Sequence, residues 1–530
     1  MKKVFISLFL FMSTMAIHAQ QADFNVVPLP QQVKLTAKPS FKLSNATRIA
    51  YSEGSEEMER NAHFLQDYVQ EITGIRPVLS TNLSQSGSNV IRLVLDGKMS
   101  GDEGYTLSCN QKGVTIKGRT PAGVFYGIQT LRKSLPVVKT AEVTLPAVEI
   151  ADAPRFSYRG VMLDCGRHYF PVKFIKEFID LLAMHNMNRF HWHLTEEQGW
   201  RLEIKKYPLL TAIGSKRAET VIGHNTQIGD GTPYEGYYTQ DEARDIVEYA
   251  RQRHIVVVPE IDMPGHQLAA MPNLGCTGGP YKVGTVWGVY DDILCLGNED
   301  TYKFCEDVLS ELIDIFPSEV IHIGGDEAPT VRVEHCPKCQ ALMQREHLTP
   351  KNIQGYFTNR IEKFVNSKGR RIMGWDEIMD GDINTSAMVH CWRNPSFGIK
   401  AAQKGHDVVL SPTKYCYFDF YQANPRAVHE PLAIGGYLPV DSVYNMDTMP
   451  KDISPENRKH IIGIQANLWT EYVAVPNHAE YMLLPRMAAL AENAWVKDRG
   501  PYSAFLPRLT RLKSLYDVYN LHYANHVWKK

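Results

Sequence analysis

The chain has 530 residues, of which 44% are hydrophobic and 10% are aromatic, so it is long enough for two domains, one of them large. Its formal net charge is -1 at pH 7, which gives no reason to expect nucleic acid or an anionic membrane surface as a partner.

The N-terminus has the pattern of an export signal. Lys2 and Lys3 precede an apolar stretch over residues 4–17, and the small Ala19 offers a cleavage position before Gln20. The stretch is shorter than the ~20 residues that a membrane-spanning helix needs. We therefore expect residues 1–19 to be a cleaved signal peptide, no membrane span, and a mature protein that is periplasmic or extracellular.

Residues 22–150 predict a small α+β domain. Alternating apolar and polar residues over 90–95 and 113–118 favour strands of a half-buried sheet. Residues 57–72 and 121–135 have helical periodicity. The region contains no convincing catalytic constellation, so we expect it to support the second domain or to contact the substrate.

From residue 159 the pattern changes to alternating buried strands and helices, which predicts an α/β fold with a (β/α)8 barrel over residues 155–500. A capping box at 239–242 opens one helix, and no strong helix lies between the last two strands. The predicted strands cover residues 160–164, 188–194, 255–262, 320–327, 371–377, 387–392, 407–411 and 462–469. The other predicted helices cover 174–187, 302–316, 352–366 and 479–495, and a helical segment over 501–530 is expected to pack on the barrel.

Acidic and aromatic residues occupy the ends of nearly all these strands, where barrel enzymes have their active sites. Aromatic rings stack on sugar rings, and carboxylates hold hydroxyls or transfer protons. A single Trp at a strand end is usually core, and a single carboxylate is usually a cap, but their recurrence on one rim favours a sugar site. The rim residues are Asp164, Arg167, His193, Glu196, Glu197, Glu260, Asp262, His266, Asp326, Glu327, Trp375, Glu377, Trp392, Tyr417, Asp419, Trp469 and Glu471.

The sharpest single signal is the run from Gly324 to Glu327. Two glycines allow close backbone approach, and two adjacent carboxylates follow them. Crowding of carboxylates should raise the pKa of one of them, which would keep it protonated as a general acid near neutral pH. Taken alone, the run fits a turn with a helix N-cap equally well.

Five motifs occur in the order found in one known family. The chain resembles glycoside hydrolase family 20, the β-N-acetylhexosaminidases, over roughly residues 155–500, and residues 22–150 resemble the N-terminal domain of that family more loosely. The motifs are Arg159-Gly160-Val161-Met162-Leu163-Asp164 with Arg167-His168, His191-Trp192-His193-Leu194, Pro259-Glu260-Ile261-Asp262-Met263-Pro264-Gly265-His266, His322-Ile323-Gly324-Gly325-Asp326-Glu327 and Trp469-Thr470-Glu471.

The resemblance implies retaining, substrate-assisted hydrolysis, which is a known exception to two-carboxylate catalysis. Glu327 would protonate the leaving oxygen, while the 2-acetamido group of the substrate attacks the anomeric carbon and forms an oxazolinium intermediate. Asp326 would orient the acetamide and stabilise its positive charge. Tyr417 would hydrogen-bond the acetamide oxygen, and the pocket walls would be Trp375, Trp392 and Trp469.

The resemblance also implies exo action on terminal β-linked GlcNAc or GalNAc of a glycan. Arg167 and Glu471 would hold the hydroxyls of the terminal sugar with help from Asp419. His266 and Glu196 match a polar relay beside the general acid, although the family often has Asp at the position of Glu196.

Several alternatives remain open. A retaining glycosidase with Glu377 or Glu260 as nucleophile, a disaccharide-releasing member of the family, and a non-catalytic sugar-binding protein are each compatible with parts of the pattern. The histidines at 191 and 193 are expected to be structural, satisfied by backbone groups. No cofactor is predicted, and the natural glycan, the oligomeric state and the preference between GlcNAc and GalNAc stay undetermined.

The nine cysteines are an odd number for an exported chain, so at least one is not paired within it. Cys336 and Cys339 form a CxxC motif, but without a second CxxC this is only a weak zinc signal. A local disulfide or plain structural cysteines are favoured, and no metal is predicted. Cys276 and Cys295 flank a Gly-rich loop that a disulfide could close, and the pairing of the four is left open.

Overall fold

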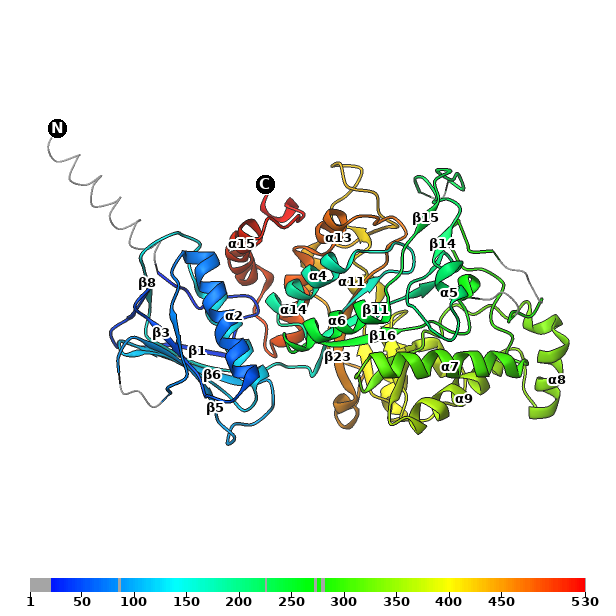
Figure 1. Cartoon of the computed structure of the whole chain (residues 1–530), viewed down its shortest axis with the longest axis horizontal. Helices are drawn as coiled ribbons and strands as arrows, with labels where there is room; N and C mark the ends of the chain where they lie inside the picture. The colour runs from blue at the N-terminus through cyan, green and yellow to red at the C-terminus, as the bar shows by residue number, and fades with distance from the viewer. Residues whose placement is uncertain (1–20, 84–86, 225, 271–273, 278–281, 530) are drawn as a thin grey trace.

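The computed structural model describes residues 21–529 except 84–86, 225, 271–273 and 278–281. The predicted signal peptide, residues 1–19, lies outside the described residues. Two domains lie side by side, with the N-terminal domain at one end of the long axis (Figure 1). Within the described part of the chain, no helix has the length and apolar character needed to cross a membrane.

The N-terminal domain has a seven-stranded mixed sheet on which two helices pack, as expected for an α+β fold. Ser55 caps the first helix, and Gly74 ends it in the left-handed conformation that glycine adopts without strain. In spatial order the sheet contains β1 (Gln32–Leu35), β9 (Val148–Asp152), β6 (Tyr105–Asn110), β7 (Gly113–Gly118), β5 (Val90–Leu95), β3 (Arg48–Ala50) and β4 (Val78–Ser80). The helices are α2 (Glu56–Thr73) and α3 (Pro121–Ser134), and β2 (Phe41–Ser44) pairs with β8 (Glu142–Leu145).

The second domain is the predicted barrel, closed by eight parallel strands. The last strand pairs with the first, with Gln465 opposite Gly160. The strand predicted over residues 320–327 ends at His322, because Gly324 and Gly325 have φ values of 65° and 95° that a strand does not accommodate. The strands are β10 (Tyr158–Asp164), β11 (Arg189–His193), β16 (Val256–Glu260), β17 (Val320–His322), β18 (Arg371–Trp375), β19 (Met388–Cys391), β20 (Val408–Leu410) and β23 (Ile461–Leu468).

Helices cover the outside of the barrel. The capping box predicted at Thr239 and Glu242 is present. The single helix predicted over 479–495 is wrong, because Pro485 has no N–H to continue the first helix and a second helix begins after it. The helices are α4 (Val172–Met184), α6 (Gln240–Arg251), α7 (Glu299–Ile315), α8 (Pro337–Glu346), α9 (Ile353–Ser367), α10 (Pro395–Gln403), α13 (Pro476–Leu483) and α14 (Arg486–Trp495).

The connection between the last two barrel strands is irregular, as the Pro- and Tyr-rich sequence predicts. It contains only short elements, and it returns the backbone to the mouth of the barrel, where Tyr417 forms an isolated bridge with Asn467. The short elements are α11 (Thr413–Cys416), β21 (Phe420–Tyr421), β22 (Gly435–Tyr437), α12 (Val440–Tyr444) and the 3-10 turn η4 (Pro455–His460).

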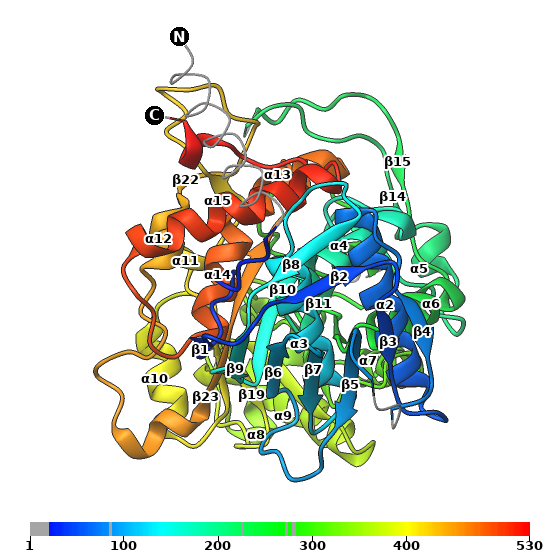
Figure 2. The ribbon, with the colours of Figure 1, turned by 90° about the vertical axis from the view of Figure 1, so that its left-hand side faces the viewer.

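The C-terminal helix α15 (Tyr502–Val518) joins the two domains. Arg508 donates to Glu492 of the barrel domain at 2.7 Å and to the Val26 carbonyl at 3.0 Å. In both views α15 lies between the barrel helices and the N-terminal strands (Figures 1 and 2). The predicted helical segment therefore packs on the barrel and contacts the N-terminal domain as well.

Candidate active site

An aromatic cluster, separate from the main hydrophobic core, lies at the C-terminal ends of the barrel strands. Trp375 ends β18, and its ring centroid is 5.8 Å from that of Trp469, which follows β23. Trp392 stacks on Tyr417 at 6.0 Å. Met162 packs beneath these rings. The four predicted aromatic residues are therefore brought together as walls of one pocket.

The backbone of β17 turns sharply to present two carboxylates at this pocket. The Gly325 N–H donates to Asp262 Oδ1 at 3.0 Å. A Cβ on Gly324 would lie 1.8 Å from the same oxygen, so only glycine fits there. Glu327 then adopts a φ of 45°, which is uncommon for a residue with a side chain. The Gly-Gly pair is thus required by the approach of Asp262.

His266 lies between the carboxylates of Asp326 and Glu327 on one side and that of Glu196 on the other. Its Nε2 atom is 3.8 Å from Asp326 Oδ2 and 3.7 Å from Glu327 Oε2, while Nδ1 hydrogen-bonds Glu196 at 3.0 Å. Burial alone would lower the pKa of His266, but Glu196, Glu327 and Asp326 together raise it well above its usual value. His266 is therefore a cation beside the acidic pair.

Crowding raises the pKa of one carboxyl of the pair Asp326 and Glu327, as expected. That carboxyl is Asp326, whereas Glu327 is the residue predicted to act as the general acid. Burial is the main cause, and Glu260 and Glu327 add to it. The pKa of Glu327 is lowered, chiefly by His266, whose Nε2 atom lies 3.7 Å from Oε2, and the Glu327 side chain is 43% exposed. Burial and the neighbouring Asp326 raise the pKa of Asp262 much further, so Asp262 carries a proton and Asp326 is the ionised partner.

Glu196 holds three cationic or polar side chains in place. It accepts from Arg167 Nη1 at 2.8 Å, from His193 Nε2 at 3.1 Å and from His266 at 3.0 Å. Burial would raise the pKa of Glu196, but Arg167 and His266 outweigh burial and lower it. The longer Glu side chain therefore reaches both the sugar-binding end and the His266 end of the site.

The expectation that His191 and His193 are satisfied by backbone groups is wrong. Both contact Glu260, at 2.8 Å from His191 Nε2 and 2.5 Å from His193 Nδ1. Glu260 also accepts from Trp375 Nε1 at 3.0 Å and lies 3.0 Å from His322. Since Glu260 is fully buried and surrounded by these partners, it orients the pocket from below and does not reach into it.

The other end of the site carries acidic oxygens without protein partners. Arg167 lies 3.4 Å from Asp164 and 3.9 Å from Glu471. Both carboxylate oxygens of Asp419, and Oε2 of Glu471, are buried and have no hydrogen-bond partner among the described residues. Burial raises the pKa of both groups. Because unpaired buried oxygens are costly, they indicate a polar ligand such as a sugar hydroxyl.

All predicted site residues thus gather at one end of the barrel. Asp262, His193 and Glu260 were placed on the rim and in the family motifs, with Glu260 also an alternative nucleophile and His193 expected to be structural, but their supporting side-chain contacts were not predicted. Glu260 and Asp262, two residues apart at a strand end, were the available signal, but their partners come from other segments. The site holds acids, one Arg and aromatic walls, the combination that binds and cleaves sugars.

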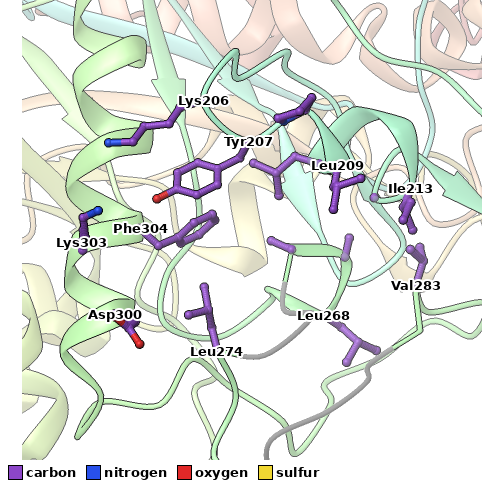
Figure 3. Close-up of a pocket in the computed structure, with 15 residues that line it drawn as sticks. Lys206, Tyr207, Leu209, Ile213, Leu268, Leu274, Val283, Asp300, Lys303 and Phe304 are labelled. Atoms are coloured by element: carbon purple, nitrogen blue, oxygen red, sulfur yellow. The ribbon is translucent and has the colours of Figure 1, made fainter.

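A second pocket, of about 570 Å³, lies under the loops that follow β11 and β16 (Figure 3). None of the predicted site residues lines it. Its walls are mostly apolar, including Tyr207, Leu209, Ile213, Leu268 and Phe304. Among the described residues that line it, only Lys206, Asp300 and Lys303 are charged, so the pocket suits an apolar ligand better than a sugar.

Family models match both domains. The model for the glycosyl hydrolase family 20 catalytic domain matches residues 156–498, and the model for domain 2 of the same family matches residues 23–153.

Individual relatives agree with these matches. A β-hexosaminidase from Porphyromonas gingivalis is 40% identical over 94% of this chain and 64% of its own length. A β-hexosaminidase from Vibrio furnissii is 37% identical over 74% of this chain and 65% of its own length. The chain thus spans slightly less than two thirds of these two relatives. The crystal structure of a family 20 exo β-N-acetylglucosaminidase from Vibrio harveyi, in complex with N-acetylglucosamine, is 30% identical, covers 97% of this chain and 79% of that protein, and has a TM-score of 0.83.

Proposed function

The chain belongs to glycoside hydrolase family 20, and we propose that it is an exo-acting β-N-acetylhexosaminidase that removes terminal β-linked GlcNAc or GalNAc from glycans. The observation that carries the proposal is the adjacent pair Asp326 and Glu327, both facing His266 beside a pocket walled by tryptophans. The names of the relatives, among them one solved with N-acetylglucosamine, support the sugar class.

The proposed first step needs no nucleophile from the enzyme. Glu327 gives its proton to the glycosidic oxygen as the bond to the anomeric carbon breaks. The carbonyl oxygen of the substrate's own 2-acetamido group attacks that carbon from the opposite face and forms a cyclic oxazolinium ion. Asp326 accepts a hydrogen bond from the acetamide N–H, and its negative charge stabilises the positive charge that develops there.

The second step reverses the roles. Glu327, now a carboxylate, removes a proton from water, and the hydroxide oxygen attacks the anomeric carbon as the oxazolinium ring opens. The acetamide is restored, Glu327 is again protonated, and two displacements retain the configuration. Tyr417 is assigned the hydrogen bond to the acetamide oxygen, and the aromatic cluster would pack against the acetamide methyl group.

The low pKa of Glu327 in the ligand-free protein must rise before it acts as an acid. Its side chain is 43% exposed, and a glycan lying over it would remove that water. Desolvation disfavours the carboxylate and raises the pKa, while His266 remains close enough to stabilise the charge when the proton leaves. Binding and protonation of Glu327 are therefore coupled in this proposal.

The unpaired oxygens at the other end of the site support exo action. Arg167, Asp419 and Glu471 form a group of largely buried polar side chains that would bind the hydroxyls of a terminal sugar. A site closed by such residues leaves no room for the chain to continue past the first sugar.

The contacts disfavour the nucleophile alternatives. Glu260 is fully buried beneath the tryptophans. Burial, Asp326 and Asp376 raise the pKa of Glu377 to about 8, so this side chain is protonated at neutral pH, and it accepts a hydrogen bond from Trp392 Nε1 at 2.9 Å. A protonated carboxyl is a poor nucleophile.

The test compares an aryl β-N-acetylglucosaminide with the matching aryl β-glucoside, using the wild type, Glu327→Gln and Asp326→Asn. We expect cleavage of the acetamido substrate alone, and a loss of ~10²-fold or more in kcat for both variants. Glu149→Gln, an exposed carboxylate on β9, is the control and should keep full activity. Comparable cleavage of the glucoside would refute acetamide participation. Activity only on an aryl glycoside of a disaccharide would favour the disaccharide-releasing alternative. Binding of the sugar without turnover would favour a sugar-binding protein.

We also propose that the protein is exported and that residues 1–19 are removed. The proposal rests on Lys2, Lys3 and the apolar stretch that follows them. Intact-mass measurement of the protein from the native cell should give a chain that begins at Gln20. A chain that retains residues 1–19 in the cytoplasm would contradict it.

A further inference from the structure

Four cysteines outside the sugar site form a compact cluster. They are Cys276, Cys295, Cys336 and Cys339, and their sulfur atoms all lie within 4.8 Å of one another. Cys276 is half-buried and the other three are buried. All nine cysteines belong to the described residues, and none forms a disulfide. The fold therefore completes the CxxC motif with two cysteines that lie far from it in sequence.

The spacing of the sulfur atoms matches a tetrahedral metal site. The Sγ atoms of Cys276 and Cys339 are 3.7 Å apart, those of Cys295 and Cys336 are 3.5 Å apart, and those of Cys295 and Cys339 are 3.7 Å apart. Four sulfurs at ~2.3 Å from a zinc ion would be ~3.8 Å from one another. Cys295 and Cys339 each have two near neighbours, so the four sulfur atoms form one continuous cluster rather than two isolated pairs.

We propose that this cluster binds one structural Zn²⁺ ion through four thiolates. Four sulfur ligands in tetrahedral array select zinc among the common divalent ions, and a site with four protein ligands has no open position for catalysis. Each thiol would release its proton to solvent on binding, so the occupied site would carry a formal charge of -2.

The backbone around the cluster is shaped to hold the CxxC turn. A Cβ on Gly297 would lie 2.2 Å from the Lys338 carbonyl carbon, so only glycine allows the two segments to approach so closely. The Gly297 N–H hydrogen-bonds the sulfur of Cys339. Cys336 stands at the N-cap of α8, where the positive end of the helix dipole stabilises thiolates.

The cluster joins the two loops that carry the catalytic residues. Cys276 and Cys295 lie in the loop after β16, which also contains His266, and they flank the bridge between Gly275 and Leu294. Cys336 and Cys339 follow β17, Asp326 and Glu327 in the chain. Cys336 is the N-cap residue of α8 and Cys339 lies in its first turn, and α8 is at the end of the molecule away from the N-terminal domain (Figure 1). The Leu294 N–H donates to the Pro264 carbonyl at 3.0 Å, two residues before His266. A bound ion would therefore fix one loop against the other.

The test measures bound metal in the mature protein, which is expressed with residues 1–19, purified after export and dialysed against metal-free buffer. We expect one equivalent of zinc per chain by mass spectrometry of the elements. The zinc content of the Cys336→Ser/Cys339→Ser double variant should be at least 10-fold lower. The control is Cys109→Ser, at a buried cysteine of β6 in the other domain, and it should keep the zinc content of the wild type.

A second measurement does not depend on folding of the variant. The wild type is unfolded in the presence of a colorimetric zinc chelator, and its thiols are counted before and after. Release of one zinc together with nine reactive thiols in the unfolded chain supports the site, because two disulfides would leave only five. Replacement by Co²⁺ should also give the absorption of tetrahedral cobalt thiolate. Two disulfides without metal, four free thiols that take up no zinc, or one equivalent of iron instead would each overturn the proposal.

Discussion

His266 Nε2 lies 3.7 Å from Glu327 Oε2, and both residues adopt left-handed backbone conformations, with φ values of 53° and 45°. Such conformations cost free energy for residues with side chains and persist only where the surroundings impose them. Here they aim the imidazole of one loop at the carboxylate of the next. The pKa of Glu327 is therefore set by two loops together.

Removing the imidazole should raise the pKa of Glu327. In His266→Gln the Glu327 carboxylate loses the nearby positive charge that lowers its pKa, so Glu327 should ionise at higher pH. Isotope-edited infrared titration measures this directly, with Glu327→Gln assigning the signal. We also expect kcat to fall about 10²-fold, because the carboxylate that Glu327 becomes after giving up its proton is no longer stabilised. An unchanged pKa of Glu327 would show that His266 has no electrostatic effect on it.

Stability should depend on the charge of Glu196. Its folded pKa is lowered, so its contribution is fully present above the unfolded pKa of ~4.3 and is lost as the pH falls through the folded value. Glu196→Gln should therefore reduce the free energy of unfolding by about 3–5 kcal/mol at pH 7, because Arg167 and His266 lose a buried partner. Urea denaturation should show this difference shrinking between pH 5 and pH 3. A difference that stays constant over this range would contradict the assigned charge.

Asp419→Asn should separate stability from activity. Both carboxylate oxygens of Asp419 are buried without a hydrogen-bond partner among the described residues, and burial and Glu471 raise its pKa. Replacement by an amide removes an expensive acid, so the melting temperature should stay constant or rise. We expect kcat/KM to fall about 10²-fold, because an NH2 donor replaces one of the two oxygens that would accept from sugar hydroxyls. Asp447→Asn, exposed on the same connection, should change neither. A lower melting temperature with unchanged kcat/KM would assign Asp419 a structural role.

The close approach of Gly324 and Asp262 can be tested by adding one methyl group. Gly324→Ala combines a left-handed backbone with an overlap of Cβ and Asp262 Oδ1, so we expect a loss of roughly 2–5 kcal/mol in unfolding free energy. Gly54→Ala is the matched control. Its φ is 82°, but nothing lies within 4 Å of the added Cβ, so it should cost only about 1–2 kcal/mol. Equal losses in thermal or urea unfolding would show that the overlap relaxes at no cost.

The barrel was predictable because the strands are short buried stretches and most of them are followed by a helical pattern. All eight predicted strands are present. Strand ends were less predictable: β17 stops at His322 because Asp262, in the loop after β16, requires the Gly324–Gly325 turn. The break at Pro485 was visible in the sequence, but the apolar periodicity on both sides of it outweighed that signal.

The site was predictable in its membership but not in its electrostatics. Motifs identify which residues gather, whereas pKa values depend on distances between strands. His193 illustrates this, because its partners Glu260 and Glu196 come from different segments and replace the backbone partners that were expected. The cysteine cluster was missed for the same reason. Sequence spacing joins only Cys336 and Cys339, and the other two arrive through the fold.

The position of α15 has a consequence for the order in which the molecule assembles during synthesis. Arg508 is synthesised 482 residues after Val26, yet it contacts both Val26 and Glu492. Glu492 also accepts from the Leu29 N–H at 3.0 Å. The N-terminal domain can fold early as a unit, but the joint between the domains cannot close until α15 has been synthesised.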